Sequence, residues 1–142
     1  MNDMFDPDII NGAFGSAPRK RDFLSGLNEK QRFAAETTEG PLVIMAGAGT
    51  GKTTVLTNRI SHIIESRLAQ PSEVLAVTFT RKAAGEMKQR LAGMLGDHRG
   101  RQIRVGNFHS ICSDILRRHA TMIDLPKNFT ILDDDGQRDV IA

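Results

Sequence analysis

The chain has 142 residues, a formal net charge of +2 and a single cysteine, which excludes an internal disulfide and a zinc cluster built on several thiolates. Apolar residues make up 39% of the sequence and charged residues 25%, as in ordinary globular proteins, and no apolar run approaches the ~18 residues of a membrane-spanning helix. Because the N-terminus also lacks the layout of a secretory signal, the composition predicts a cytoplasmic protein with no membrane partner that forms one domain or part of a larger one.

The N-terminal region combines a polar segment with a first helix. Residues 1–22 mix Asn, Asp, Gly, Pro and Ser with isolated apolar residues, so we expect a mobile tail ahead of a folded domain over 23–142. A helix is expected over about 28–37, with Asn28 as its cap and Gln31 three residues later, as in a capping box. The alternative is that the Gln31 amide, which has both a donor and an acceptor, reads an adenine edge. On the local sequence alone, the capping box is the commoner explanation.

A small-residue loop follows a short apolar run over 42–45, which predicts a strand, and precedes a helix predicted over about 51–67. Residues of this size let backbone N–H groups approach a triphosphate closely. Lys52 is placed to reach the β- and γ-phosphates, and the Thr53 hydroxyl to complete a Mg²⁺ shell. The alternative is a glycine-rich turn with a surface lysine. The loop residues are Ala46, which stands where the strict motif has glycine, Gly47, Ala48, Gly49, Thr50, Gly51, Lys52 and Thr53.

Two further strand-and-helix units follow. We expect a strand over 74–79 with a helix over 80–95, then a polar loop over 96–100, a strand over 101–107 and a helix over 108–119. Strands joined through helices form right-handed crossovers in a parallel sheet, and ligands bind beyond the carboxyl ends of its strands. Cys112 falls in an apolar helical pattern, which favours packing in the core or at its edge over a reactive thiol.

Charge is unevenly distributed in the second half of the chain. Residues 81–118 contain nine Lys or Arg and three acids, a net charge of +6 that suits either a phosphate backbone or a solvated helix face. Near the C-terminus, a short strand is expected over 129–132, followed by three aspartates over 133–135. A helix cap is the commoner explanation of these acids, and a Mg²⁺ carboxylate is the alternative.

Taken in order, several stretches resemble motifs of the UvrD/Rep-type DNA helicases of superfamily 1. They are Leu27-Asn28-x-x-Gln31, similar to the adenine-reading Q motif; 46–53, similar to a phosphate loop in which alanine at the first place is usual; 78–87, similar to motif Ia; and 107–110, similar to motif Ib. Residues 129–133 resemble the stretch that leads into an inserted helical subdomain. The resemblance covers roughly residues 24–142 and implies the α/β fold of a RecA-like P-loop NTPase, an incomplete parallel sheet flanked by helices.

The resemblance also implies a role for each matching residue. Gln31 would recognise adenine, which reverses the local interpretation, Lys52 would neutralise charge on the γ-phosphate as the catalytic residue, and Thr53 would bind Mg²⁺. Thr54 also belongs to the nucleotide-binding set, but it stands where relatives frequently have an arginine, a change expected to loosen contact with the base. The DNA-binding set would be Phe79, Thr80, Arg81, Asn107, Phe108 and His109, with Arg81 where relatives commonly have Asn and Asn107 where they commonly have Thr. A buried structural role is the alternative for His109.

The function implied is that of an ATP-dependent 3′-to-5′ DNA helicase in repair or replication. Its cofactors would be ATP and Mg²⁺, and its partners single-stranded DNA, junctions of single- and double-stranded DNA, and the remainder of the helicase chain. The family's Walker B segment, sensor motifs and arginine fingers would follow later, so we expect this chain to bind ATP weakly with negligible ATPase or unwinding activity. Two alternatives are a helicase–nuclease subunit, which a nuclease domain in the full gene would reveal, and a self-contained P-loop module, which requires Asp133 or Asp134 beside Thr53.

Overall fold

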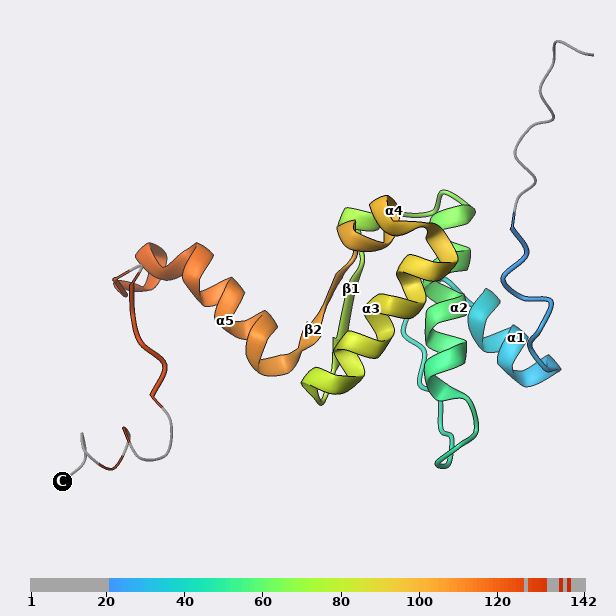
Figure 1. The fold of residues 1–142 in the computed structure, drawn as a ribbon, viewed down its shortest axis with the longest axis horizontal. Coiled ribbons are helices and arrows are strands. Elements are labelled where there is room, and N and C mark those ends of the chain that lie inside the picture. The colour runs from blue at the N-terminus through green and yellow to red at the C-terminus, as the bar shows by residue number, and fades with distance from the viewer. Residues whose placement is uncertain (1–20, 127, 133–135, 137, 139–142) are drawn as a thin grey trace, which may run out of the picture. The chain divides into compact units, whose positions relative to one another are not determined.

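The computed structural model describes residues 21–126, 128–132, 136 and 138. The chain divides after Gln70 into two compact units, which are described separately (Figure 1). The predicted tail lies outside the described residues except at its end, and so do the three aspartates over 133–135. None of the helices in the described ranges combines the length and the apolar character that crossing a membrane requires.

The first unit contains two helices, α1 (Glu29–Glu36) and α2 (Lys52–Glu65), packed against each other. The predicted capping box is confirmed, since the backbone N–H of Gln31 donates to Asn28 Oδ1 at 3.0 Å and that of Asn28 donates to Gln31 Oε1 at 3.1 Å. The Arg59 guanidinium of α2 donates to backbone carbonyls at the end of α1, which fixes the two helices together. The buried apolar residues of this unit are Leu24, Ala34, Ala35, Val55, Ile60 and Ile64.

The strand predicted over 42–45 is not formed, so that prediction is wrong for this structure. Val43 and Met45 are 86% and 94% exposed, and the segment runs as an irregular connection into the phosphate loop. A strand exists only through its hydrogen bonds to a neighbour, and the described residues of the first unit contain no second strand to supply them. The segment has the apolar sequence of a strand, but the described part of the first unit supplies no strand to pair with it.

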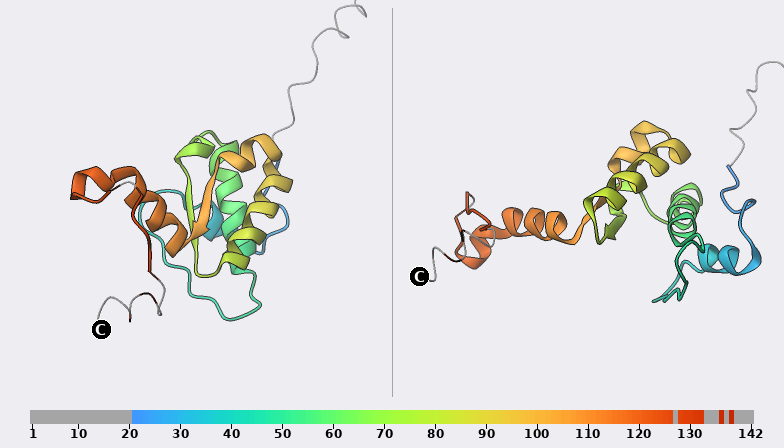
Figure 2. Two further views of the ribbon diagram at one scale, coloured as in Figure 1. Left: turned by 60° about the vertical axis from the view of Figure 1, so that its left-hand side comes forward. Right: turned by 60° about the horizontal axis from the view of Figure 1, so that its bottom comes forward.

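The second unit is a βαβ arrangement with additional helices. Strands β1 (Leu75–Thr78) and β2 (Arg104–Asn107) pair in parallel, and the chain between them forms α3 (Arg81–Leu95) and α4 (Asp97–Gln102). α3 packs along the strand pair in every view (Figures 1 and 2). α5 (Phe108–His119) follows β2 directly, and 3₁₀ turns lie at Pro71–Glu73 and Ala120–Ile123. The buried apolar residues are Ala76, Ala84, Met87, Leu91, Leu95, Ile103, Val105, Ile111 and Ala120.

Two boundaries in this unit differ from the sequence prediction. The polar loop expected over 96–100 is helical, because α4 begins directly after Gly96 and carries Asp97 in its first turn and Arg101 in its last, where the helix dipole favours them. The strand expected from 101 therefore begins only at Arg104. The strand predicted over 129–132 is also wrong, since these described residues pair with neither β1 nor β2.

α5 is the least covered helix of the second unit. It runs on from the end of β2, away from α3 and α4 (Figure 2), and among its apolar residues Ile111 is buried, whereas Ile115 and Leu116 are partly exposed. Cys112 is exposed, so of the predicted packing in the core or at its edge, the core position is wrong. The periodic pattern identified an apolar helix face correctly, but only the first turn of that face meets the sheet.

Candidate functional site

The phosphate loop turns sharply at two glycines. Gly49 and Gly51 have φ values of +76° and +85°, a region that residues with a Cβ rarely adopt, and Gly51 directly precedes the first residue of α2. The loop therefore ends at the N-terminus of a helix of 14 residues, where free backbone N–H groups and the helix dipole favour an anion.

Side chains of the loop are hydrogen-bonded to its own carbonyl oxygens. The Lys52 ammonium donates to the carbonyls of Gly47 at 2.6 Å and Ala46 at 3.0 Å, and the Thr50 hydroxyl donates to Gly47 at 2.8 Å. Lys52 thus folds back over the loop instead of extending into solvent. The lysine is nonetheless exposed, as in the alternative of a glycine-rich turn with a surface lysine, and its ammonium places a positive charge at the loop that was predicted to hold phosphate.

Gln31 reaches the same loop from α1. Its Nε2 donates to the Thr50 carbonyl at 3.1 Å, while its Oε1 accepts the capping-box bond, so one amide joins the start of α1 to the phosphate loop. Gln31 and residues of the phosphate loop line one cavity of about 340 Å³. The other residues that line this cavity come from α1 and its cap, from the connection before the loop, and from α2. The predicted site residues in its lining are Gln31, Ala46, Gly47, Thr50 and Lys52.

Sequence reasoning missed Lys30, which also lines this cavity. The sequence feature that could have identified Lys30 is its position one residue before Gln31, on the first turn of α1. Because Lys30 and Lys52 both face the cavity, it presents two cations to an incoming ligand.

The remaining predicted nucleotide residues, which are Ala48, Gly49, Gly51, Thr53 and Thr54, do not line this cavity. Ala48 and Gly49 form the tip of the loop, and Thr53 and Thr54 are exposed on the first turn of α2. The described residues contain no group of three or more His, Cys, Asp or Glu that is arranged to hold a metal ion, so Thr53 is the one candidate Mg²⁺ ligand of the prediction that can be placed. Asp133 and Asp134, which the self-contained P-loop alternative requires beside Thr53, lie outside the described residues.

Alanine at Gly51 is expected to destabilise the first unit more than alanine at Gly49. Both substitutions force a Cβ into the left-handed region, which costs about 1 kcal/mol or more. A Cβ at Gly51 would also lie 3.0 Å from Gln31 Nε2, whereas one at Gly49 would meet nothing within 4 Å. Urea unfolding of Gly51→Ala and Gly49→Ala measures the difference, and equal free energies of unfolding would contradict the Gln31 contact.

The second predicted set of residues lies at one end of the β1–β2 pair. Thr78 and Asn107 are register partners, so Phe79 and Phe108, which follow them, leave neighbouring strands at the same carboxyl edge. Both aromatic rings are accessible, with Phe79 86% and Phe108 58% exposed. This edge therefore offers two aromatic side chains, on which nucleic-acid bases could stack without sequence preference.

The polar members of this set divide into helix caps and exposed side chains. Thr80 Oγ1 accepts from Ala83 N at the start of α3, and Asn107 Oδ1 accepts from Ser110 N at the start of α5. Asn107 is buried, so its amide fixes how α5 leaves the sheet. Arg81 and His109 are exposed, which contradicts the alternative of a buried structural histidine.

Comparison with known proteins gives one consistent result. Residues 27–142 match the UvrD/REP helicase N-terminal domain family. The ATP-dependent DNA helicase PcrA of Leuconostoc citreum is 52% identical over 114 residues, which cover 80% of this chain and 15% of that protein. The protein of the same name from Staphylococcus aureus (strain NCTC 8325) is 50% identical over 118 residues, 83% of this chain and 16% of that protein. The chain thus spans about one sixth of the length of these relatives.

Proposed function

The chain belongs to the UvrD/REP helicase family, and from this premise we propose that it forms the nucleotide site and the first DNA contacts of an ATP-dependent DNA helicase that moves 3′ to 5′. The observation that carries the proposal is the hydrogen bond from Gln31 to the Thr50 carbonyl. It joins the residue proposed to read adenine to the loop proposed to hold the phosphates, within one cavity. The capping box accounts for the Oε1 atom of Gln31, and the bond from its Nε2 to the loop is the additional contact on which the proposal rests.

In the nucleotide site, we assign the adenine edge to Gln31 and the phosphates to the loop amides and Lys52. Both side chains hold loop carbonyls in this structure, so binding requires that each exchanges these bonds for bonds to the nucleotide. The exchange costs little for Lys52, because its ammonium already lies over the loop and a phosphate is a stronger acceptor than a neutral carbonyl. Thr53 supplies one hydroxyl to Mg²⁺, which when bound neutralises phosphate charge.

At the sheet edge, we assign base stacking to Phe79 and Phe108. Their rings are exposed and extend from adjacent strands, so one single strand of DNA can contact both. Arg81 and His109 are available for its phosphates, while Asn107 acts as a positioning residue that holds the start of α5. Single-stranded DNA and its junctions with duplex DNA are the proposed substrates.

The experiment separates binding from turnover. We expect the 142-residue chain to bind ATP–Mg²⁺ in isothermal titration without releasing phosphate, because phosphoryl transfer needs a clamp on both sides of the γ-phosphate and a positioned water. In the full-length protein, we expect ATP-dependent unwinding of a duplex with a 3′ single-stranded tail and little unwinding of one with a 5′ tail. Robust phosphate release by the chain alone would contradict its proposed role as one part of the enzyme. Unwinding from 5′ tails would contradict the direction.

A further inference from the structure

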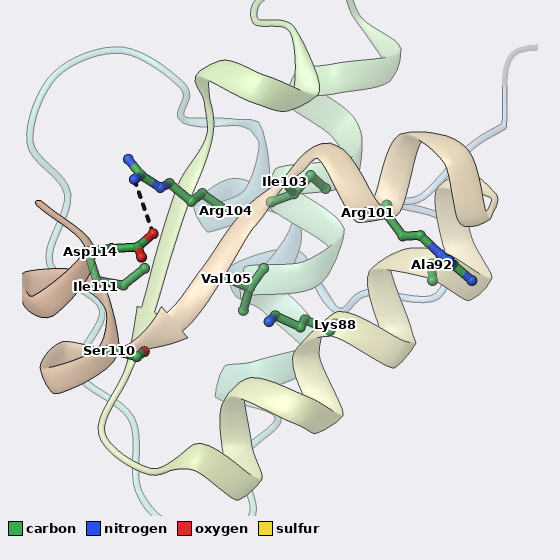
Figure 3. Close-up of a pocket in the computed structure, with 10 residues that line it drawn as sticks. Lys88, Ala92, Arg101, Ile103, Arg104, Val105, Ser110, Ile111 and Asp114 are labelled. Atoms are coloured by element: carbon green, nitrogen blue, oxygen red, sulfur yellow. Dashed lines mark hydrogen bonds and ion pairs between the residues drawn. The ribbon is translucent and has the colours of Figure 1, made fainter. Parts of the chain in front are cut away.

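A groove with a charged rim lies in the second unit, between α3 and α4 on one side and α5 on the other (Figure 3). It encloses about 440 Å³, and its floor is buried, because Ile103, Val105 and Ile111 are only 4%, 5% and 8% exposed. A ligand in this groove therefore contacts the side chains of the rim. We define the basic groove by the four charged residues of its lining, which are Lys88, Arg101, Arg104 and Asp114.

Positive charge is in excess in the basic groove. Its described lining contains three cations and one carboxylate. Asp114 Oδ2 lies 3.4 Å from Arg104 and 3.6 Å from Arg118, so two guanidinium groups already share its negative charge. Arg101 pairs with Asp97 at 3.8 Å, but both side chains are about four-fifths exposed, and such pairs contribute little. The groove therefore retains positive charge that an anionic ligand can use.

The three cations are spread through the groove and do not converge on one point. Figure 3 shows Arg104 directed toward Asp114 of α5. Lys88 extends from α3 toward β2, and Arg101 lies at the far wall, on α4 (Figure 3). One small anion cannot contact side chains that diverge in this way, whereas a polymer of phosphates can. The arrangement therefore favours a polyanion as the ligand.

Close packing fixes α4 and its arginine against α3. A Cβ at Gly100 would lie 2.6 Å from Ala92 Cα and 2.8 Å from Ala92 N, so the two helices touch through their backbones. Lys88 precedes Ala92 by four residues and lies on the same face of α3, while Arg101 directly follows Gly100 on α4. The backbones that carry these two cations are therefore held at defined places by the fold.

The basic groove adjoins the sheet edge to which we assign base stacking. Ser110 and Ile111, on the first turn of α5, line the groove and follow Phe108 by two and three residues. No aromatic side chain is among the described residues of the lining, so the groove suits phosphates and not unpaired bases. Each phosphate contact releases more counterions from duplex DNA than from a single strand, so a surface of cations alone favours duplex DNA.

We propose that the basic groove binds the phosphate backbone of double-stranded DNA, beside the single strand that stacks on Phe79 and Phe108. This inference rests on the proposed function, because it assigns the duplex arm of a DNA junction to a second surface of the same unit. An acidic protein segment also has suitable charge, but the position of the groove next to the DNA edge favours nucleic acid.

The salt dependence of duplex binding tests the proposal. Fluorescence anisotropy measures the affinity of the 142-residue chain for a labelled blunt duplex over a range of salt concentrations. Each phosphate contact contributes about 0.9 to the slope of log affinity against log salt concentration. We expect Lys88→Ala and Arg101→Ala each to reduce this slope by about one. Arg90→Ala is the matched control, since Arg90 is exposed on α3 but does not line the groove.

Gly100→Ala tests the placement of α4 without a change of charge. The added Cβ would meet the backbone of Ala92, so we expect α4 to shift and the slope to fall. Gly93→Ala is its control, because a Cβ there would meet nothing within 4 Å, and the slope is expected to stay the same. Circular dichroism checks that the helices are retained. If Gly100→Ala does not fold, Lys88→Ala and Arg101→Ala decide the outcome.

Three results would overturn the proposal. The first is an equal loss of slope in Arg90→Ala and Lys88→Ala, which would indicate attraction by overall charge. The second is tighter binding of polyglutamate than of duplex DNA, which would indicate an acidic protein partner. The third is an unchanged slope for Lys88→Ala and Arg101→Ala in the full-length protein. Failure of base stacking is a separate outcome, since alanine at Phe79 and Phe108 would then leave single-strand affinity unchanged while the groove variants still reduce the duplex slope.

Discussion

Replacement of Lys52 by alanine is expected to weaken ATP binding to the chain about tenfold to a hundredfold. Hydrogen bonds to a charged group contribute about 1.5–3 kcal/mol each, and the Lys52 ammonium is the cation that lies directly over the phosphate loop. Isothermal titration with ATP–Mg²⁺ measures the loss. The fold is expected to remain, because the carbonyls of Ala46 and Gly47 belong to exposed residues, and water can replace the ammonium there.

The matched control for this prediction is Lys88→Ala. Lys88 is an exposed lysine in the second unit, so its removal changes the net charge by the same amount without touching the loop. If both variants lose ATP affinity equally, the contribution of Lys52 is one of overall charge, and the proposed phosphate site is wrong. Circular dichroism of both variants checks that the helices are retained.

The double substitution of Phe79 and Phe108 by alanine is expected to reduce the affinity for single-stranded DNA about thirtyfold or more. Stacking of a base on an aromatic ring contributes about 1–3 kcal/mol, and both rings are available at the same edge of the sheet. Fluorescence anisotropy with a labelled oligothymidine measures the affinity. Thermal unfolding is expected to change little, because these exposed side chains bury little surface.

Phe33→Ala is the control for these two aromatic residues. Phe33 is 68% exposed on α1, in the other unit, so it matches them in type and exposure but has no proposed contact with DNA. Equal loss of affinity in Phe33→Ala would contradict the assignment of the sheet edge as the DNA-binding surface. Single variants then separate the contributions of Phe79 and Phe108.

Local signals in the sequence predicted most of the helices. Asn28 and Gln31 form the capping box expected from their spacing, and the predicted helices over 80–95 and 108–119 match α3 and α5 closely. These elements depend on contacts within a few residues, which a sequence displays directly. α4 was missed because its six residues, Asp97–Gln102, contain no apolar residue and so show no helical period.

Features that depend on distant partners could not be predicted in the same way. The apolar run over 42–45 has the composition of a strand, yet a strand also requires a neighbour. Cys112 lies on an apolar face, but the sequence does not say what covers that face. The hydrogen bond between Gln31 and Thr50 joins residues 19 positions apart, and it emerges only when α1 and α2 are packed. The sequence analysis predicted that both residues bind the same nucleotide, and the structure adds that they contact each other.

Hydrogen bonds within the phosphate loop affect the entropy change of nucleotide binding. Lys52 and Thr50 both tie side chains to the carbonyl of Gly47, so much of the conformational entropy of the loop is already lost before any ligand arrives. The Thr50 bond can be kept when a nucleotide binds, whereas the Lys52 bonds are exchanged for bonds to phosphate, so the saving in entropy that improves affinity comes from the ordering that Thr50 supplies. ATP binding to this chain should therefore carry a smaller entropic penalty than binding to a loop that must first fold around its ligand.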